Sequence, residues 1–211
     1  MEGPETLEIT PLDLRGVRIY RGGIVVSALA FVLTAALIGL TRGWEAASAT
    51  AWLADHQAIL VTAVLLLIAG TGTSVIMIHL YIRQFHTLLK LLFGIGLVSV
   101  TVFAAISFVT PRQFLEILYL TPYGTLGFGF VLAALCGITV KEAFCFGMIE
   151  AILFAAVTPV LVLGHLFRWL HPFPAFILLC LDAFFLCIFA ARKEIMAADL
   201  DVGDKSVYTR N

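Results

Sequence analysis

Six stretches of this chain are apolar over about the 20 residues that a helix needs to cross a hydrocarbon core roughly 30 Å thick. They cover residues 23–40, 59–82, 89–109, 123–140, 143–163 and 175–191. The stretches are continuously apolar and do not alternate, which argues against the strands of a membrane barrel. A helix also satisfies its own backbone groups in lipid. The sequence therefore predicts an all-α polytopic membrane protein, a compact bundle of six transmembrane helices that forms one integral membrane domain over residues 1–211.

The composition supports the same class. Hydrophobic residues make up 61% of the chain and charged residues 13%, with a mean hydropathy of +1.04. Soluble domains usually have about 45–50% apolar and about 25% charged residues. The net charge is -1 and no segment concentrates Lys and Arg, so nothing favours a nucleic-acid partner. The expected partner is the lipid bilayer.

Basic residues are unevenly distributed between the two sides of the predicted bundle. Ten of the 13 Lys and Arg residues lie in the two terminal segments and in the loops after the second and fourth spans. The other three are Arg42, Arg112 and Arg168, in the alternate loops. By the positive-inside rule, both termini are expected to be cytoplasmic.

Two loops on the opposite side carry apolar and aromatic residues. Residues 41–58 include Trp44 and Trp52, which predicts a short interfacial helix. Residues 111–122 are expected to lie on the membrane surface. The small residues Gly70 and Gly72 lie inside the second span and let helices approach closely. They indicate packing within the bundle or, alternatively, a homodimer face.

Two carboxylates, Glu150 and Asp182, fall inside the fifth and sixth predicted spans. Burying charge in a bilayer costs free energy, so such residues are candidate functional groups. Counting from Lys141 and from Arg192 places both about 14–15 Å from the inner boundary. If the two side chains meet, they share a proton, as in a proton-coupled carrier or channel for a small solute. Alternatively, each is protonated and hydrogen-bonded to a neighbouring helix, or paired with a basic side chain.

A second candidate site is a motif on the predicted cytoplasmic side, formed by Lys141, Glu142 and Cys145. Lys141 and Glu142 are predicted to occupy the tight fourth loop. Glu142 would then stand at the start of the fifth helix, where the helix dipole favours an acid. Cys145 lies close to the same boundary. It would take part in a redox or metal site, or fill space as a small apolar residue.

Four histidines are candidate ligands. His79 and His86 are seven residues apart near the cytoplasmic end of the second span, and His165 and His171 lie on the opposite side. Either set would ligate a metal, and His79 would serve as an axial ligand of haem or chlorophyll. Neither set has a known ligand spacing. Polar anchoring at the membrane interface is the alternative, and the sequence leaves the metal and the cofactor open.

Motifs of catalysis are absent from the sequence, which contains no G-x-S-x-G elbow, P-loop or dinucleotide fingerprint. This favours a non-enzymatic protein without excluding an enzyme. We expect a scaffold, assembly factor, or pigment- or partner-binding protein, with a membrane protein or a second copy as its partner. The proton-coupled carrier that uses Glu150 and Asp182 is the alternative.

One segment carries a resemblance to a known family. Residues 136–147 read Cys-Gly-Ile-Thr-Val-Lys-Glu-Ala-Phe-Cys-Phe-Gly, followed by Glu150 and later by His171 and Pro172. This pattern resembles an uncharacterised family of six-span integral membrane proteins associated with cyanobacteria and related photosynthetic lineages. The resemblance covers most of the chain and implies a plasma or thylakoid membrane, with roles in assembly, pigment binding or transport. It assigns no catalytic residue.

Overall fold

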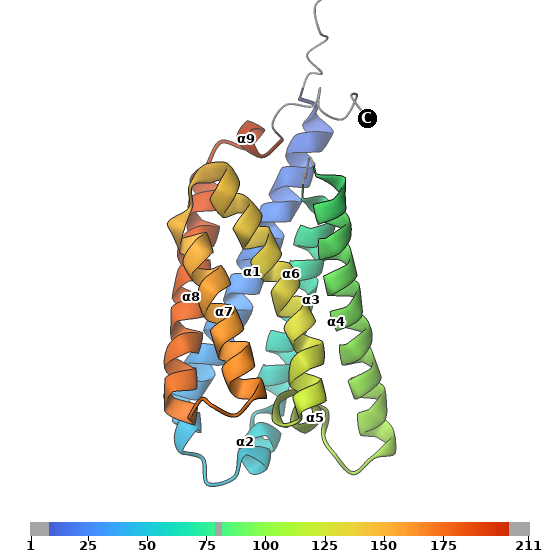
Figure 1. Cartoon of the computed structure of the whole chain (residues 1–211), viewed down its shortest axis with the longest axis vertical. Helices are drawn as coiled ribbons and strands as arrows, with labels where there is room; N and C mark the ends of the chain where they lie inside the picture. The colour runs from blue at the N-terminus through green and yellow to red at the C-terminus, as the bar shows by residue number, and fades with distance from the viewer. Residues whose placement is uncertain (1–8, 79–81, 203–211) are drawn as a thin grey trace, which may run out of the picture.

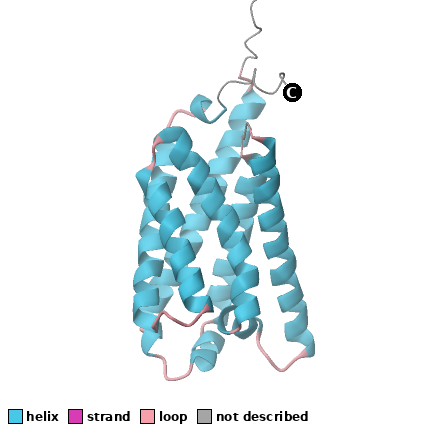
Figure 2. Cartoon of the chain, in the orientation of Figure 1, coloured by secondary structure: helices cyan, strands magenta, loops and turns pink. Residues whose placement is uncertain are grey.

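The computed structural model describes residues 9–78 and 82–202, and in these ranges the chain is helical with no strand (Figure 2). Six of the described helices are long and apolar enough to cross a membrane. They are α1 (Pro11–Thr41), α3 (Gln57–Met77), α4 (Arg83–Val109), α6 (Pro122–Phe146), α7 (Ile149–Leu166) and α8 (Pro172–Ile195). The prediction of an all-α polytopic bundle is confirmed.

The long helices stand side by side, and the short elements close the two ends (Figure 1). We call the end where α1 begins and α8 ends the terminal end; it carries α9 (Asp199–Val202). The other end, here the distal end, carries η1 (Gly43–Glu45), α2 (Ala49–Asp55) and α5 (Phe114–Leu120). The short helix expected within residues 41–58 is therefore present as α2.

Helix α5 differs from its expected position on the membrane surface. The side chains of Leu115 and Leu118 are fully buried and that of Ile117 is almost so. The apolar residues of α5 thus pack inward against the bundle. A short amphipathic sequence fits an interface or a protein core equally well, and only the neighbouring helices decide between them.

Helix α1 begins well before the predicted first span. Thr10 caps it through a capping box with Asp13, and Pro11 occupies the first turn, where its missing N–H is not needed. The helix continues through polar residues such as Tyr20 and Arg21, which are both buried. Hydropathy alone placed the start at residue 23 because it scored these side chains as too polar for the bilayer.

The boundary between the fourth and fifth spans also differs from the prediction. Lys141 and Glu142 lie inside α6, not in a loop, and α6 ends at Phe146. Gly147 follows with a φ of 63°, a left-handed conformation that glycine adopts without steric cost. Helix α7 starts at Ile149. In the sequence, the charges of Lys141 and Glu142 indicated a loop. In the structure, ion pairs allow both residues to stay within the helix.

Helices α1 and α3 approach each other closely at Gly70. A Cβ atom placed on Gly70 would lie 2.6 Å from the carbonyl oxygen of Gly23 and 2.6 Å from the hydroxyl of Ser27. No larger residue fits there without moving the backbone. Gly70 therefore allows close packing within the bundle, which was the first of the two predicted alternatives.

Candidate functional site

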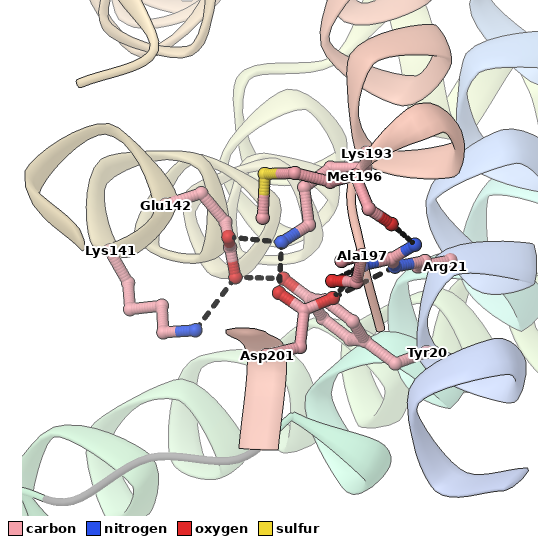
Figure 3. Close-up of polar contacts among 8 residues, drawn as sticks. All are labelled: Tyr20, Arg21, Lys141, Glu142, Lys193, Met196, Ala197 and Asp201. Atoms are coloured by element: carbon pink, nitrogen blue, oxygen red, sulfur yellow. Dashed lines mark hydrogen bonds and ion pairs between the residues drawn. The ribbon is translucent and has the colours of Figure 1, made fainter. Parts of the chain in front are cut away.

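A group of charged and polar side chains is buried at the terminal end of the bundle (Figure 3). We call it the ionic cluster. Its members come from α1, α6, α8 and α9, and are Tyr20, Arg21, Lys141, Glu142, Lys193 and Asp201. Two of the predicted site residues, Lys141 and Glu142, belong to it, whereas the other four members were not predicted.

Glu142 accepts hydrogen bonds from three other members of the cluster, and its side chain is fully buried. Its Oε1 accepts hydrogen bonds from the hydroxyl of Tyr20 at 2.6 Å and from Nζ of Lys141 at 2.8 Å. Its Oε2 accepts from Nζ of Lys193 at 2.7 Å. Both carboxylate oxygens are thus satisfied, as a buried charge requires.

Lys193 is fully buried on α8 and connects two carboxylates. Its ammonium group donates to Glu142 and to Asp201. It also lies 4.4 Å from the ring centre of Phe146, a distance at which a ring face attracts a cation. The ammonium therefore has negative charge or ring faces as neighbours, which offsets its removal from water.

Arg21 connects α1 to the chain that follows α8. Its Nε lies 2.8 Å and its Nη2 2.7 Å from Oδ2 of Asp201. The same guanidinium donates to the carbonyl oxygens of Met196 at 2.6 Å and Ala197 at 3.1 Å. These four contacts hold α9 and the preceding turn against the bundle.

Glu150 lies in the first turn of α7, and both its carboxylate oxygens accept hydrogen bonds from Nη1 of Arg192 at 2.8 Å. The predicted depth of Glu150 is wrong, because the count from Lys141 treated residues of α6 as part of the fifth helix. Glu150 stands at the terminal end of the bundle. The prediction that a basic side chain pairs with a carboxylate holds here.

Asp182 is fully buried in the middle of α8. Its Oδ1 accepts a hydrogen bond from the hydroxyl of Thr158 at 3.1 Å, and its Oδ2 has no hydrogen-bond partner among the residues that the structure describes. Thr158 lies eight residues after Glu150, which is about 12 Å along a helix. In this arrangement Glu150 and Asp182 have separate partners and do not meet.

The predicted ligand residues are dispersed. His79 lies outside the described residues. The ring Nε2 of His86 contacts the Val75 carbonyl oxygen at 3.0 Å, and Nε2 of His165 contacts that of Tyr119 at 2.6 Å. Across residues 9–78 and 82–202, no three His, Cys, Asp or Glu side chains gather as a metal site would need.

The two remaining predicted residues lie near helix termini. His171 is the residue before α8 and makes no side-chain capping hydrogen bond. Cys145 is exposed in the last turn of α6, whereas Glu142 on the same helix is buried. Metal or pigment ligation by any of these residues stays a prediction.

The distal half of the bundle contains a cavity of about 630 Å³, which we call the distal cavity. Five transmembrane helices, α1, α3, α6, α7 and α8, supply its walls. Large apolar side chains dominate there, among them Phe31, Leu67, Phe128, Leu132 and Leu179. Trp44 and Trp52 line it at the distal end. This cavity is a site that the sequence analysis did not find.

Asp182 lies close to the distal cavity without lining it. Leu179, which lines the cavity, precedes Asp182 by three residues on α8, and Leu161, which also lines it, follows Thr158 by three residues on α7. Three residues correspond to about one helical turn. The Thr158–Asp182 hydrogen bond therefore lies about one turn beyond the cavity lining, toward the terminal end.

These features define a polytopic α-helical membrane protein with a buried ionic cluster at one end and an apolar cavity toward the other. Residues 73–210 match the family described as uncharacterized integral membrane protein (DUF2301), and the chain belongs to that family. No curated protein and no solved structure matches the chain.

Proposed function

We propose that this protein is a non-enzymatic membrane protein that binds an apolar molecule in the distal cavity. The cavity itself is the observation that carries the proposal. Its volume of about 630 Å³ lies within the range of about 300–1,000 Å³ that is usual for small-molecule sites. Its walls are mostly aliphatic and aromatic, as such sites are.

The lining favours a molecule with an extended apolar part, such as a lipid chain or a pigment. Polar groups at the cavity are few and include His165 and Arg168 near the distal ends of helices. Trp44 stacks on Phe176 with ring centres 4.5 Å apart, which gives the cavity an aromatic border. If haem or chlorophyll is the ligand, His165 is the predicted histidine that borders the site.

Tryptophan fluorescence provides the test, because Trp44 and Trp52 line the cavity and Trp169 does not. The probe is 9,10-dibromostearic acid, whose bromine atoms quench indole fluorescence on contact. The protein carries Trp169→Phe so that the two remaining tryptophans report on the cavity. We expect saturable quenching in this background.

The matched variants are Thr125→Phe, which fills the cavity, and Leu126→Phe, which adds the same ring next to it. Thr125 lines the cavity, whereas the side chain of Leu126 is 51% exposed on the outer surface of α6. Quenching should be lost with Thr125→Phe and retained with Leu126→Phe. Equal quenching in both variants would mean that the fatty acid acts only from the surrounding membrane.

The unpartnered Oδ2 of Asp182 favours a second candidate function, a proton-coupled carrier or channel for a small solute. A buried carboxyl oxygen without a hydrogen bond is costly in a membrane interior and is found where an ionisable group has a task. In liposomes, this function requires pH-dependent solute or proton flux that Asp182→Asn abolishes. Flux that survives Asp182→Asn would reject Asp182 as the coupling group.

We also propose that both termini face the cytoplasm of a plasma or thylakoid membrane, on the basis of the basic residues counted above. Cys145 is the exposed cysteine at the terminal end. A membrane-impermeant maleimide should label it only after intact cells are permeabilised. Labelling of Cys145 in intact cells, and its loss in Cys145→Ser, would place the termini on the other side.

A further inference from the structure

A second apolar hollow lies between α3 and α4 in the distal half of the bundle. It has a volume of about 670 Å³, and we call it the α3–α4 groove. It exists because α4 stands at the edge of the bundle (Figure 1) and packs mainly against α6, less against α3. Its walls include Val61, Leu65 and Ile68 of α3 and Leu97, Val100 and Ala104 of α4.

The length of the groove corresponds to one leaflet of a bilayer. Its lining on α4 extends from Leu97 to Phe108, which is about 16 Å along a helix. Half of a hydrocarbon core about 30 Å thick is about 15 Å. The groove is therefore about as long as one acyl chain of the distal leaflet.

The distal rim of the groove is polar and carries a positive charge. Gln57, Thr110, Arg112 and Gln113 form this rim. Arg112 is exposed, and its guanidinium contacts the Tyr123 hydroxyl at 3.4 Å. Within the described residues, Arg112 makes no ion pair with a carboxylate. Its charge is therefore available to an anion at the level of the lipid headgroups.

We propose that the α3–α4 groove binds an anionic phospholipid of the distal leaflet, with one acyl chain between the helices and the phosphate at Arg112. A guanidinium suits this role because its planar array of donors matches two phosphate oxygens. The polar rim and the unpaired charge favour a phosphate headgroup over the apolar helix of a second copy. This proposal is independent of the ligand in the distal cavity.

Native mass spectrometry of the full chain in a mild detergent tests the proposal. The probes are dioleoyl phosphatidylglycerol and dioleoyl phosphatidylcholine, which share their chains and differ in net charge. The wild type should bind phosphatidylglycerol at least about tenfold more tightly, because the choline cation of phosphatidylcholine offsets the attraction between its phosphate and Arg112. Arg112→Gln should remove this preference, and Arg112→Lys should retain part of it.

Substitutions of two neighbouring alanines test where the acyl chain binds. Ala104 lines the groove, whereas the exposed Ala105 does not. Ala104→Phe should weaken the binding of both lipids, and Ala105→Phe should leave it unchanged. Equal binding of the two lipids to the wild type would overturn the headgroup assignment. Equal effects of the two alanine variants, or a dimer that Ala104→Phe disrupts, would overturn the proposed occupant of the groove.

Discussion

The terminal end and the deeper part of this bundle differ in how many partners their buried polar side chains have. At the terminal end, Glu142 and Lys193 are fully buried, and each has several charged or polar partners. Deeper in the bundle, Asp182 is equally buried but has, within the described part of the chain, one hydrogen bond and one unpartnered oxygen. The space beyond it toward the distal end is an apolar cavity.

This difference indicates different tasks. Buried charges contribute to a unique structure only when all partners are in place, because each loses its hydration. The ionic cluster joins α1, α6, α8 and α9, so it fixes how the helices meet at the terminal end. An apolar cavity lowers stability, and its retention in the distal half is consistent with a ligand that fills it.

The largest expected effect is that of Lys193→Met. The substitution leaves Glu142 and Asp201 without the cation between them, and removal of one partner from a buried ion pair costs about 3–5 kcal/mol. The free energy of unfolding in mixed micelles should fall by this amount. If Glu142→Gln is added, the loss should be smaller than the sum of the two single losses, because the residues are in contact. If the losses of unfolding free energy were additive, Lys193 and Glu142 would not interact as the ionic cluster requires.

Arg21→Met should have the next largest effect. It removes the hydrogen bonds to Asp201, Met196 and Ala197, but Asp201 keeps Lys193 as a partner. The free energy of unfolding should therefore fall by about 1.5–3 kcal/mol, the contribution of one hydrogen bond to a charged group. The clearest readout is local, because the lost contacts hold α9. Amide hydrogen exchange should accelerate in residues 197–202 and stay unchanged in α4. Uniform acceleration in both segments would mean that the whole bundle, and not α9 alone, has loosened.

Glu150→Gln should cost less than either change in the cluster. The side chain of Arg192, its partner, is 48% exposed, so solvent screens this pair, and exposed pairs contribute up to about 1 kcal/mol. Thermal unfolding of wild type and variant should converge as salt concentration rises. A loss that is large and independent of salt would show that Glu150 belongs with the fully buried charges.

Asp182→Leu should cost least, and it compares the two halves most directly. The substitution removes a carboxyl group that has one unpartnered oxygen, so the free energy that its burial costs is recovered when an apolar side chain of similar size replaces it. Unfolding free energy should stay within about 1 kcal/mol of the wild type, since a single neutral hydrogen bond contributes about that much. The matched control is Thr158→Val, which removes the other partner. If Asp182→Leu lowered the free energy of unfolding as much as Lys193→Met does, the Asp182 side chain would be a contact that stabilises the bundle.

The sequence determined the class of this protein and its membrane-spanning regions. Each span is a local property, because about 20 consecutive apolar residues are needed wherever a helix crosses lipid. The same reasoning identified Glu150 and Asp182 as unusual, since a carboxyl group stands out in an apolar run. Where a helix continued through polar residues, local hydropathy made it too short: the predicted start of α1 came too late and the predicted end of α6 too early.

Only the tertiary structure decided which polar groups meet. Tyr20 and Glu142 are 122 residues apart, and Arg21 and Asp201 are 180 residues apart. Lys193 appeared in the sequence as one of several charges that orient the last helix, and nothing local distinguished it as buried. Its burial depends on how α1, α6 and α8 are rotated toward one another. The distal cavity likewise results from the packing of five helices, because a void belongs to the space between elements and not to any one of them.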